Sequence, residues 1–198
     1  MRRKIFDVLV SAGGMVVVAV LLVAGALLMW GQSFIASSVH TQLVRQEIFF
    51  PAKAAFADAK AGTEITPSMI PSVSQYAGQQ LLTGAQAEVY ANDFIAVHLS
   101  EMPYHGVYAT ISSAARSAKA GSATATELTS LEQVSFQGTT LRGLLLEAYA
   151  FATIGVIALW AGIAAFVLAF VMAVLVGLGF YHARTTPPDV ELLEKLEA

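Results

Sequence analysis

A single uncharged stretch near the C-terminus constrains what this chain can fold into. Residues 148–181 contain no Asp, Glu, Lys or Arg, and these 34 residues read AYAFATIGVIALWAGIAAFVLAFVMAVLVGLGFY. About 20 apolar residues are enough to cross the hydrocarbon core of a bilayer as a helix. Apolar residues at helical spacing already begin at Leu141, Leu144 and Leu145. The sequence therefore predicts one long helix, residues 139–182, which starts outside a membrane and runs into it.

A second apolar stretch lies near the N-terminus. The sequence reads Met-Arg-Arg-Lys at positions 1–4, and no residue from Val8 to Gly31 is charged. This run of 24 residues is longer than the roughly 7–15 apolar residues of a signal peptide. We predict a first transmembrane helix within residues 1–31. The composition agrees, because 56% of the residues are hydrophobic and only 13% are charged, as is typical of membrane proteins.

Basic residues near the ends of the two spans predict the orientation, because Lys and Arg accumulate on the cytoplasmic side. Three basic residues at positions 2–4 precede the first span, and Arg184 follows the second. We predict a multi-pass protein of the plasma membrane with both termini in the cytoplasm. The cytoplasmic tail, 183–198, forms at most a short helix. Residues 31–147 then lie outside, with six Lys or Arg and nine Asp or Glu, a net charge of −3 that is compatible with translocation.

The segment between the spans, residues 32–138, has the pattern of helices, so the predicted fold class is all-α: two transmembrane helices with a helical extracytoplasmic region between them. We expect the first span to continue outward until Pro51 ends or bends it. Residues 57–75, rich in Ala, Pro, Ser and Thr, are expected to be irregular.

The second half of this region contains signals for three helices. Thr83 is the expected N-cap of a helix that Pro103 closes or follows just beyond its end. A weaker helix follows over 107–119, and a Gly/Ser/Ala linker follows it at 121–125. Thr126 is expected to cap a short helix to Phe136, and Gly138 is expected to turn the chain into the final long helix.

Span two carries a row of small residues, each four positions from the next: Ala161, Ala165, Ala169, Ala173 and Gly177. Lipid tails are as apolar as leucine, so transmembrane helices associate largely by close backbone approach, which small residues at i, i+4 permit. We predict that this row, called the small-residue row, packs against another transmembrane helix. The alternative is that Ala and Gly are merely common in membrane helices.

The partner of the small-residue row is not specified by the row itself. It could be the first span, a second copy of the chain, or another protein. The first span offers Gly13, Gly14 and Gly25, but these do not form a matching row. We therefore favour a helix of another subunit along at least part of the row.

Only one group of residues suggests catalysis. His98, Glu101 and His105 would share one helix face, and two histidines with a carboxylate can bind a metal ion. Pro103 interrupts that helix, so we favour a structural role for these side chains and predict no metal, no cofactor and no enzymatic activity. The chain has no cysteine, and its net charge of −3 gives no indication of a nucleic-acid partner.

Several stretches resemble a known family. They are residues 77–84 (AGQQLLTG), 87–92 (AEVYAN), 94–99 (FIAVHL), 136–146 (FQGTTLRGLLL) and 148–151 (AYAF). Together with the two-span layout, they are similar to an actinobacterial family of two-span membrane proteins with a helical external region. Members of this family are often labelled aromatic-ring-opening dioxygenases, and one is a respiratory supercomplex association factor.

The resemblance implies a structural subunit with no redox centre of its own. It implies that the chain joins a membrane-bound respiratory supercomplex, in contact with the cytochrome bc1-type complex, the aa3-type oxidase and membrane lipids. Two alternatives remain: a membrane-anchored extracytoplasmic metalloenzyme that uses His98, Glu101 and His105, and a self-associating envelope protein. The ring-opening label requires an iron site, for which only these three residues are candidates.

Overall fold

A computed structural model describes residues 3–187 as helices joined by short turns, with no β-strand in this range. The C-terminal tail from residue 188, where a short helix is predicted, lies outside the described residues. The chain divides into two compact units, Met1–Phe34 with Gly155–Ala198, and Ile35–Ile154. We call the first the helix pair and the second the helical unit. The predicted all-α class with two apolar spans is confirmed.

Helix α1 spans Arg3–Gln46 and is continuous for 44 residues, roughly 66 Å at 1.5 Å per residue. It continues beyond the apolar stretch, as predicted, but the prediction that Pro51 ends or bends it is wrong. The helix ends at Gln46 because Glu47 adopts a left-handed conformation with φ 52°. The chain then runs extended, and Phe49 forms an isolated antiparallel bridge with Gln80.

Helix α6 spans Ala123–Thr185, and its 63 residues extend over roughly 95 Å. The predicted break at Gly138 is therefore wrong, and the long helix begins before residue 139. Gly138 lies inside the helix, where a Cβ atom would lie 2.9 Å from Leu99 Cδ2, so this glycine makes room for a neighbouring side chain. Ser122 caps the helix in place of Thr126, because its hydroxyl accepts a hydrogen bond from the Ala125 N–H at 3.1 Å.

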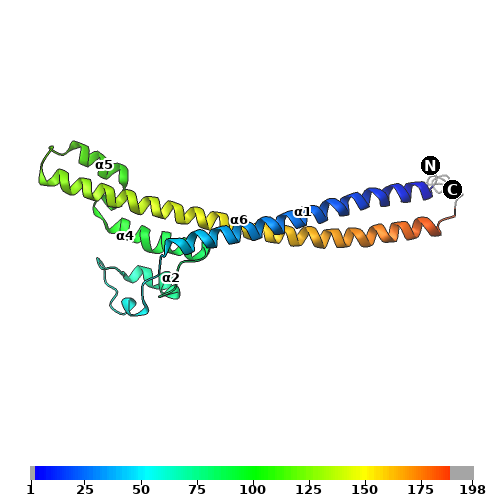
Figure 1. The fold of residues 1–198 in the computed structure, drawn as a ribbon, viewed down its shortest axis with the longest axis horizontal. Coiled ribbons are helices and arrows are strands. Elements are labelled where there is room, and N and C mark those ends of the chain that lie inside the picture. Colours follow the sequence, from blue (N-terminus) through cyan, green and yellow to red (C-terminus); the bar gives the residue numbers. More distant parts are fainter. Residues whose placement is uncertain (1–2, 188–198) are drawn as a thin grey trace, which may run out of the picture. The chain divides into compact units, whose positions relative to one another are not determined.

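Both long helices are long and apolar enough to cross a membrane, with mean hydropathies of 2.6 and 2.7 over their most apolar windows. Only 11% of that window in α1 and 17% in α6 is buried. The core helix of a water-soluble protein would be mostly buried, so these exposed apolar surfaces fit a lipid environment. In the helix pair, the N-terminal part of α1 and the C-terminal part of α6 lie side by side and antiparallel (Figure 1).

The helical unit is built from short elements around one apolar core. After α1 come η1 (Lys53–Phe56), η2 (Pro67–Met69), α2 (Ile70–Val73) and η3 (Ser74–Tyr76). The prediction of irregular structure over 57–75 is therefore wrong for its second half. Pro67 and Pro71 lie in the first turns of helical segments, where a missing N–H costs nothing.

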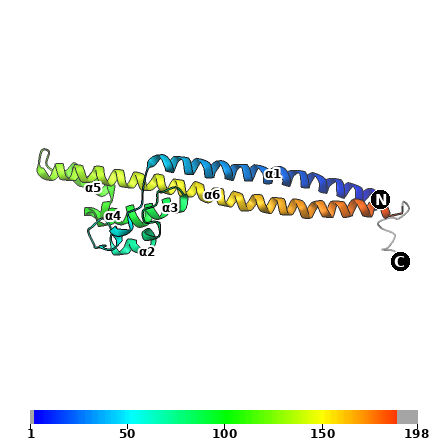
Figure 2. The same cartoon turned by 60° about the horizontal axis from the view of Figure 1, so that its bottom comes forward.

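The remaining elements are α3 (Gly84–Val89), η4 (Tyr90–Ile95), α4 (Ala96–Glu101), η5 (Pro103–Gly106) and α5 (Tyr108–Ser117). Thr83 is the N-cap, as predicted, and forms a capping box with Gln86. Helix α4 ends before Pro103, and α5 occupies the region of the predicted weaker helix. Within the helical unit these elements lie along the N-terminal part of α6 (Figure 2).

Candidate functional site

The helix pair has a seam in which the less exposed residues recur at alternating steps of three and four, the spacing of a coiled coil. We call this set the seam. On α1 it consists of Asp7, Ser11, Gly14, Val18, Leu21, Gly25 and Leu28, and on α6 of Ala158, Gly162, Ala165, Ala169, Met172, Val176, Gly179 and Ala183. A period of 3.5 residues keeps one face of each helix against the other along the whole pair.

Glycines of α1 set the distance between the two helices. A Cβ atom on Gly14 would lie 2.6 Å from Val176 Cγ2, and one on Gly25 would lie 3.1 Å from Phe166 Cζ. Real Cβ contacts are rarely this short, so a larger residue at either position would require the Val176 or Phe166 side chain to move. Gly14 and Gly25 therefore each make room for a bulky side chain of α6.

Glycines of α6 do the same in the opposite direction. A Cβ atom on Gly162 would lie 3.2 Å from both Cγ and Sδ of Met29. One on Gly179 would overlap the buried hydroxyl of Ser11. Close backbone approach through small residues is the main source of helix association in lipid, and here it joins the two spans of one chain.

The small-residue row of α6 coincides with the seam only at its centre. Ala165 and Ala169 are 8% and 1% exposed, whereas Ala161, Ala173 and Gly177 are exposed. A step of four residues advances 400°, so each member is displaced about 40° from the previous one around the helix. The row therefore leaves the seam at both ends, and the part at Ala173 and Gly177 faces away from α1. Its predicted packing against another subunit stays a prediction.

The seam ends near the predicted cytoplasmic side at a pair of titratable side chains. His182 Nε2 lies 3.8 Å from the Asp7 carboxylate, and the pair is oppositely charged when His182 is protonated. Asp7 is more buried than His182, with side-chain exposures of 19% and 51%. This pair marks the level at which both apolar runs stop.

The three residues of the metalloenzyme alternative do not converge. His98 Nδ1 lies 2.9 Å from the carbonyl oxygen of Phe94, one turn back in the helix. Glu101 is the last residue of α4, and His105 lies beyond Pro103 with φ 54°. Within residues 3–187, no group of three or more His, Asp or Glu side chains is placed to hold a metal ion.

A π-helical segment, η4, faces α6 in the helical unit. Its Asn92 accepts a hydrogen bond from the Arg142 guanidinium at 2.9 Å, while the Arg142 Nε is buried without a partner. A π-turn widens the helix locally and commonly marks a functional position. Close to it, a Cβ atom on Gly84 would overlap that of Ala152, so α3 and α6 lie in backbone contact.

A row of aromatic rings runs from the buried Phe50 in the core of the helical unit to the half-buried His98. Ring centroids are 5.1 Å apart for Phe50 and Tyr76, 5.3 Å for Phe50 and Tyr90, 4.7 Å for Tyr90 and Phe94, and 4.6 Å for Phe94 and His98. Such contacts are within the range that stabilises aromatic pairs. Burial raises the pKa of the Tyr90 phenol, and the negative charge of Glu64 raises it further.

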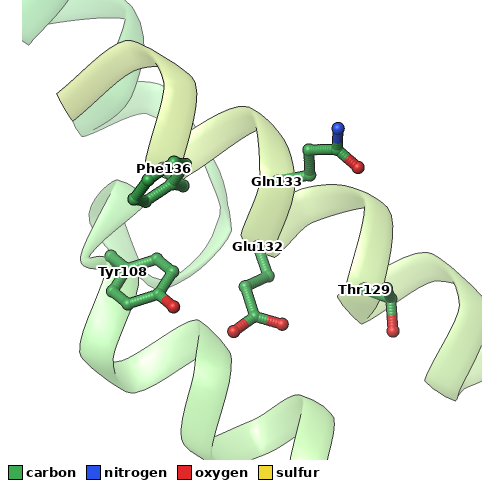
Figure 3. Close-up of a pocket in the computed structure, with 5 residues that line it drawn as sticks. All are labelled: Tyr108, Thr129, Glu132, Gln133 and Phe136. Atoms are coloured by element: carbon green, nitrogen blue, oxygen red, sulfur yellow. The ribbon is translucent and has the colours of Figure 1, made fainter. Parts of the chain in front are cut away.

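A hollow of about 290 Å³ lies where α5 meets α6. It is lined by Tyr108 of α5 and by Thr129, Glu132, Gln133 and Phe136 of α6 (Figure 3). The Tyr108 and Phe136 rings are 5.7 Å apart at 54°, and the Glu132 side chain extends between the two helices (Figure 3). The hollow thus combines two aromatic walls with one carboxylate.

The sequence predictions named Gly14 and Gly25 as small positions of the first span but did not place them in a seam with α6, and they did not include the hollow. The sequence does contain a signal for the seam, because Ser11, Gly14 and Gly25 all fall on one series of positions separated by alternating steps of three and four. A search restricted to small residues at i, i+4 does not find this series. For the hollow, no sequence signal exists, because Tyr108 and Phe136 meet only after the turn between α5 and α6 brings them together.

Comparison with known proteins gives no relative. The chain matches no protein-family model, no curated protein and no solved structure.

Proposed function

We propose that this chain is a non-catalytic accessory subunit of an actinobacterial respiratory supercomplex of the cytochrome bc1 and aa3 type. It stabilises the assembly through transmembrane and extracytoplasmic helix contacts. The identity of the complex rests on the sequence resemblance of residues 77–151. A contact function is supported by the helix pair, because its seam leaves part of the small-residue row exposed.

That exposed part is the observation on which the proposal depends. Ala165 and Ala169 are buried in the helix pair, but Ala173 and Gly177 are exposed, and a Cβ atom on Gly177 would meet nothing within 4 Å. Small residues four apart on an exposed helix face allow a second helix to approach closely. The bulky side chains on the same helix, such as Phe170 at 71% exposure, would contact lipid or fill the space beside such a partner.

The proposed topology places both termini in the cytoplasm and the helical unit outside the plasma membrane. It rests on the basic residues at positions 2–4 and on Arg184, which flank the apolar runs on the same side. The antiparallel arrangement of α1 and α6 agrees, because Asp7 and His182 lie together at one end of the helix pair.

The experiment compares two double variants of the tagged full-length chain with the wild type after gentle detergent extraction. Ala173→Leu with Gly177→Leu adds bulk to the exposed part of the row. Val167→Leu with Val174→Leu adds bulk to two other positions, 57% and 47% exposed, and serves as the matched control. Co-purified cytochrome is quantified from haem spectra and mass spectrometry.

We expect the Ala173/Gly177 variant to insert normally and to lose at least about tenfold of the co-purified cytochrome, because added side chains separate the backbones. The Val167/Val174 control should retain it. Full retention in the first variant would show that the row is not the contact. A wild-type chain that co-purifies without any cytochrome would refute the assignment to the respiratory complex.

A further inference from the structure

The hollow between α5 and α6 has a composition that the proposed function does not use. Its lining contains two aromatic rings, two uncharged polar side chains and one carboxylate, Glu132. The two rings are also accessible from the surface, because Tyr108 and Phe136 are 42% and 54% exposed. Exposed aromatic residues around a small concave site are typical of contact surfaces between proteins.

We propose that this hollow binds an arginine side chain of a partner protein on the extracytoplasmic side. Glu132 is the only charged residue of the lining, so the charge that complements the hollow is positive. The one basic side chain of α5, Arg116, donates a hydrogen bond to Ser112 and so makes a contact of its own elsewhere. The inference holds whichever complex the chain joins.

Arginine fits the hollow better than other cations. A planar guanidinium stacks on aromatic rings and pairs with a carboxylate through two parallel N–H donors, whereas a lysine ammonium offers a point charge. A metal ion would need several oxygen ligands, and Glu132 supplies one carboxylate. The volume of about 290 Å³ lies at the lower limit of small-molecule pockets, roughly 300–1,000 Å³, and suits a single inserted side chain.

The geometry also gives a reason for specificity. Tyr108 and Phe136 come from different helices, so their rings form two walls of one site instead of one flat surface. Glu132 comes from the same helix as Phe136, one turn away, and its side chain extends beside the two rings (Figure 3). A guanidinium that binds here would stack on the exposed part of one of these rings while it pairs with the Glu132 carboxylate.

The test uses the full-length chain in the cells that express it. A photoreactive benzoylphenylalanine replaces Gln133, which lines the hollow and is exposed. After illumination, cross-linked peptides are identified by mass spectrometry. We expect one peptide of another protein that contains an arginine within reach of position 133.

The charge dependence of this cross-link is then measured. Glu132→Gln keeps the shape of the side chain and removes its charge, and it should lower the cross-link yield about tenfold or more, as for a hot-spot residue. Glu127→Gln is the matched control, because Glu127 is exposed on the same helix but does not line the hollow. Glu132→Arg should abolish the cross-link, and Arg→Glu at the identified partner position should restore it.

The inference is overturned by any of four outcomes: a cross-link yield unchanged by Glu132→Gln, no restoration by the exchanged charges, cross-links only to lipid, or cross-links only to a second copy of this chain. The outcome also separates the two proposals. A charge-dependent cross-link to a protein outside the respiratory complex supports the arginine site and contradicts the proposed function. If cytochrome still co-purifies but the cross-link yield does not depend on Glu132, the proposed function is supported and the arginine site is contradicted.

Discussion

Gly106 is a position in the helical unit where adding a single methyl group should strongly destabilise the fold. Its φ of +64° lies in the left-handed region, and a Cβ atom would lie 2.9 Å from the carbonyl carbon of Leu99 and 3.0 Å from its Cα. These neighbours are backbone atoms, so they cannot move aside as a flexible side chain would. The Gly106 carbonyl also accepts a hydrogen bond from the buried Ser135 hydroxyl at 2.6 Å.

Gly106→Ala therefore has two costs. The left-handed conformation costs a residue with a Cβ atom about 1–2 kcal/mol, and overpacking against a fixed backbone costs about 1–3 kcal/mol. Even the lower sum, about 2 kcal/mol, corresponds to roughly a thirtyfold change in a local opening equilibrium. The junction between α4 and α5 is the segment that should open.

Hydrogen exchange of the full-length chain in lipid nanodiscs measures this opening. Amides of α5, Tyr108–Ser117, should exchange at least about thirtyfold faster in Gly106→Ala than in the wild type. Gly143→Ala is the matched control, because Gly143 lies inside α6 and a Cβ atom there meets nothing within 4 Å. That variant should keep or raise protection, since Ala favours a helix over Gly by about 1 kcal/mol. Equal α5 exchange in the two variants would refute the reasoning.

Two further predictions concern the phenol of Tyr90 and the topology. Burial and Glu64 raise the pKa of Tyr90, so the folded state favours the neutral phenol. The stability that this preference contributes is complete below the ordinary tyrosine pKa of about 10, and it is lost as the pH rises through the pKa of Tyr90 in the folded state. Tyr90→Phe should thus lose less stability than the wild type between pH 8 and pH 11 in denaturant unfolding, and parallel losses would contradict this. For topology, cysteines placed at Gly62 or Gly121, in a chain with no native cysteine, should react with an impermeant thiol reagent in intact cells. Protection at both positions would reverse the proposed orientation.

The sequence predicts the two apolar spans within the long helices because the signal for a span is local. An uncharged run bounded by charges is visible without any tertiary contact, and so are Thr83 as a cap and Pro103 beyond a helix end. The cap at Thr83 and the helix end before Pro103 follow from backbone chemistry within a few residues. The overall class and the two apolar spans could therefore be predicted.

The errors occur where tertiary packing decides the role of a residue. Gly138 reads as a turn in sequence, but it lies inside α6. A glycine is present there because the Leu99 side chain occupies the space that a Cβ atom would need. Pro51 reads as a helix end, but Glu47 ends α1 first by adopting a positive φ, which no preference of glutamate predicts. The path of α1 decides which members of the small-residue row are buried and which are exposed. The sequence of α6 alone carries no information about that path.

The fit of glycines to bulky side chains along the seam determines how the two spans can move. Sliding α6 by one turn, about 3.6 residues, would bring Phe166 from Gly25 to the level of Leu21 or Met29, whose side chains are larger than that of glycine. Val176 would leave Gly14 in the same movement. Each mismatch of this kind costs about 1–3 kcal/mol or forces the helices apart. A piston-like displacement of one helix along the other is thus disfavoured, and the two spans should tilt and rotate in the bilayer as one body.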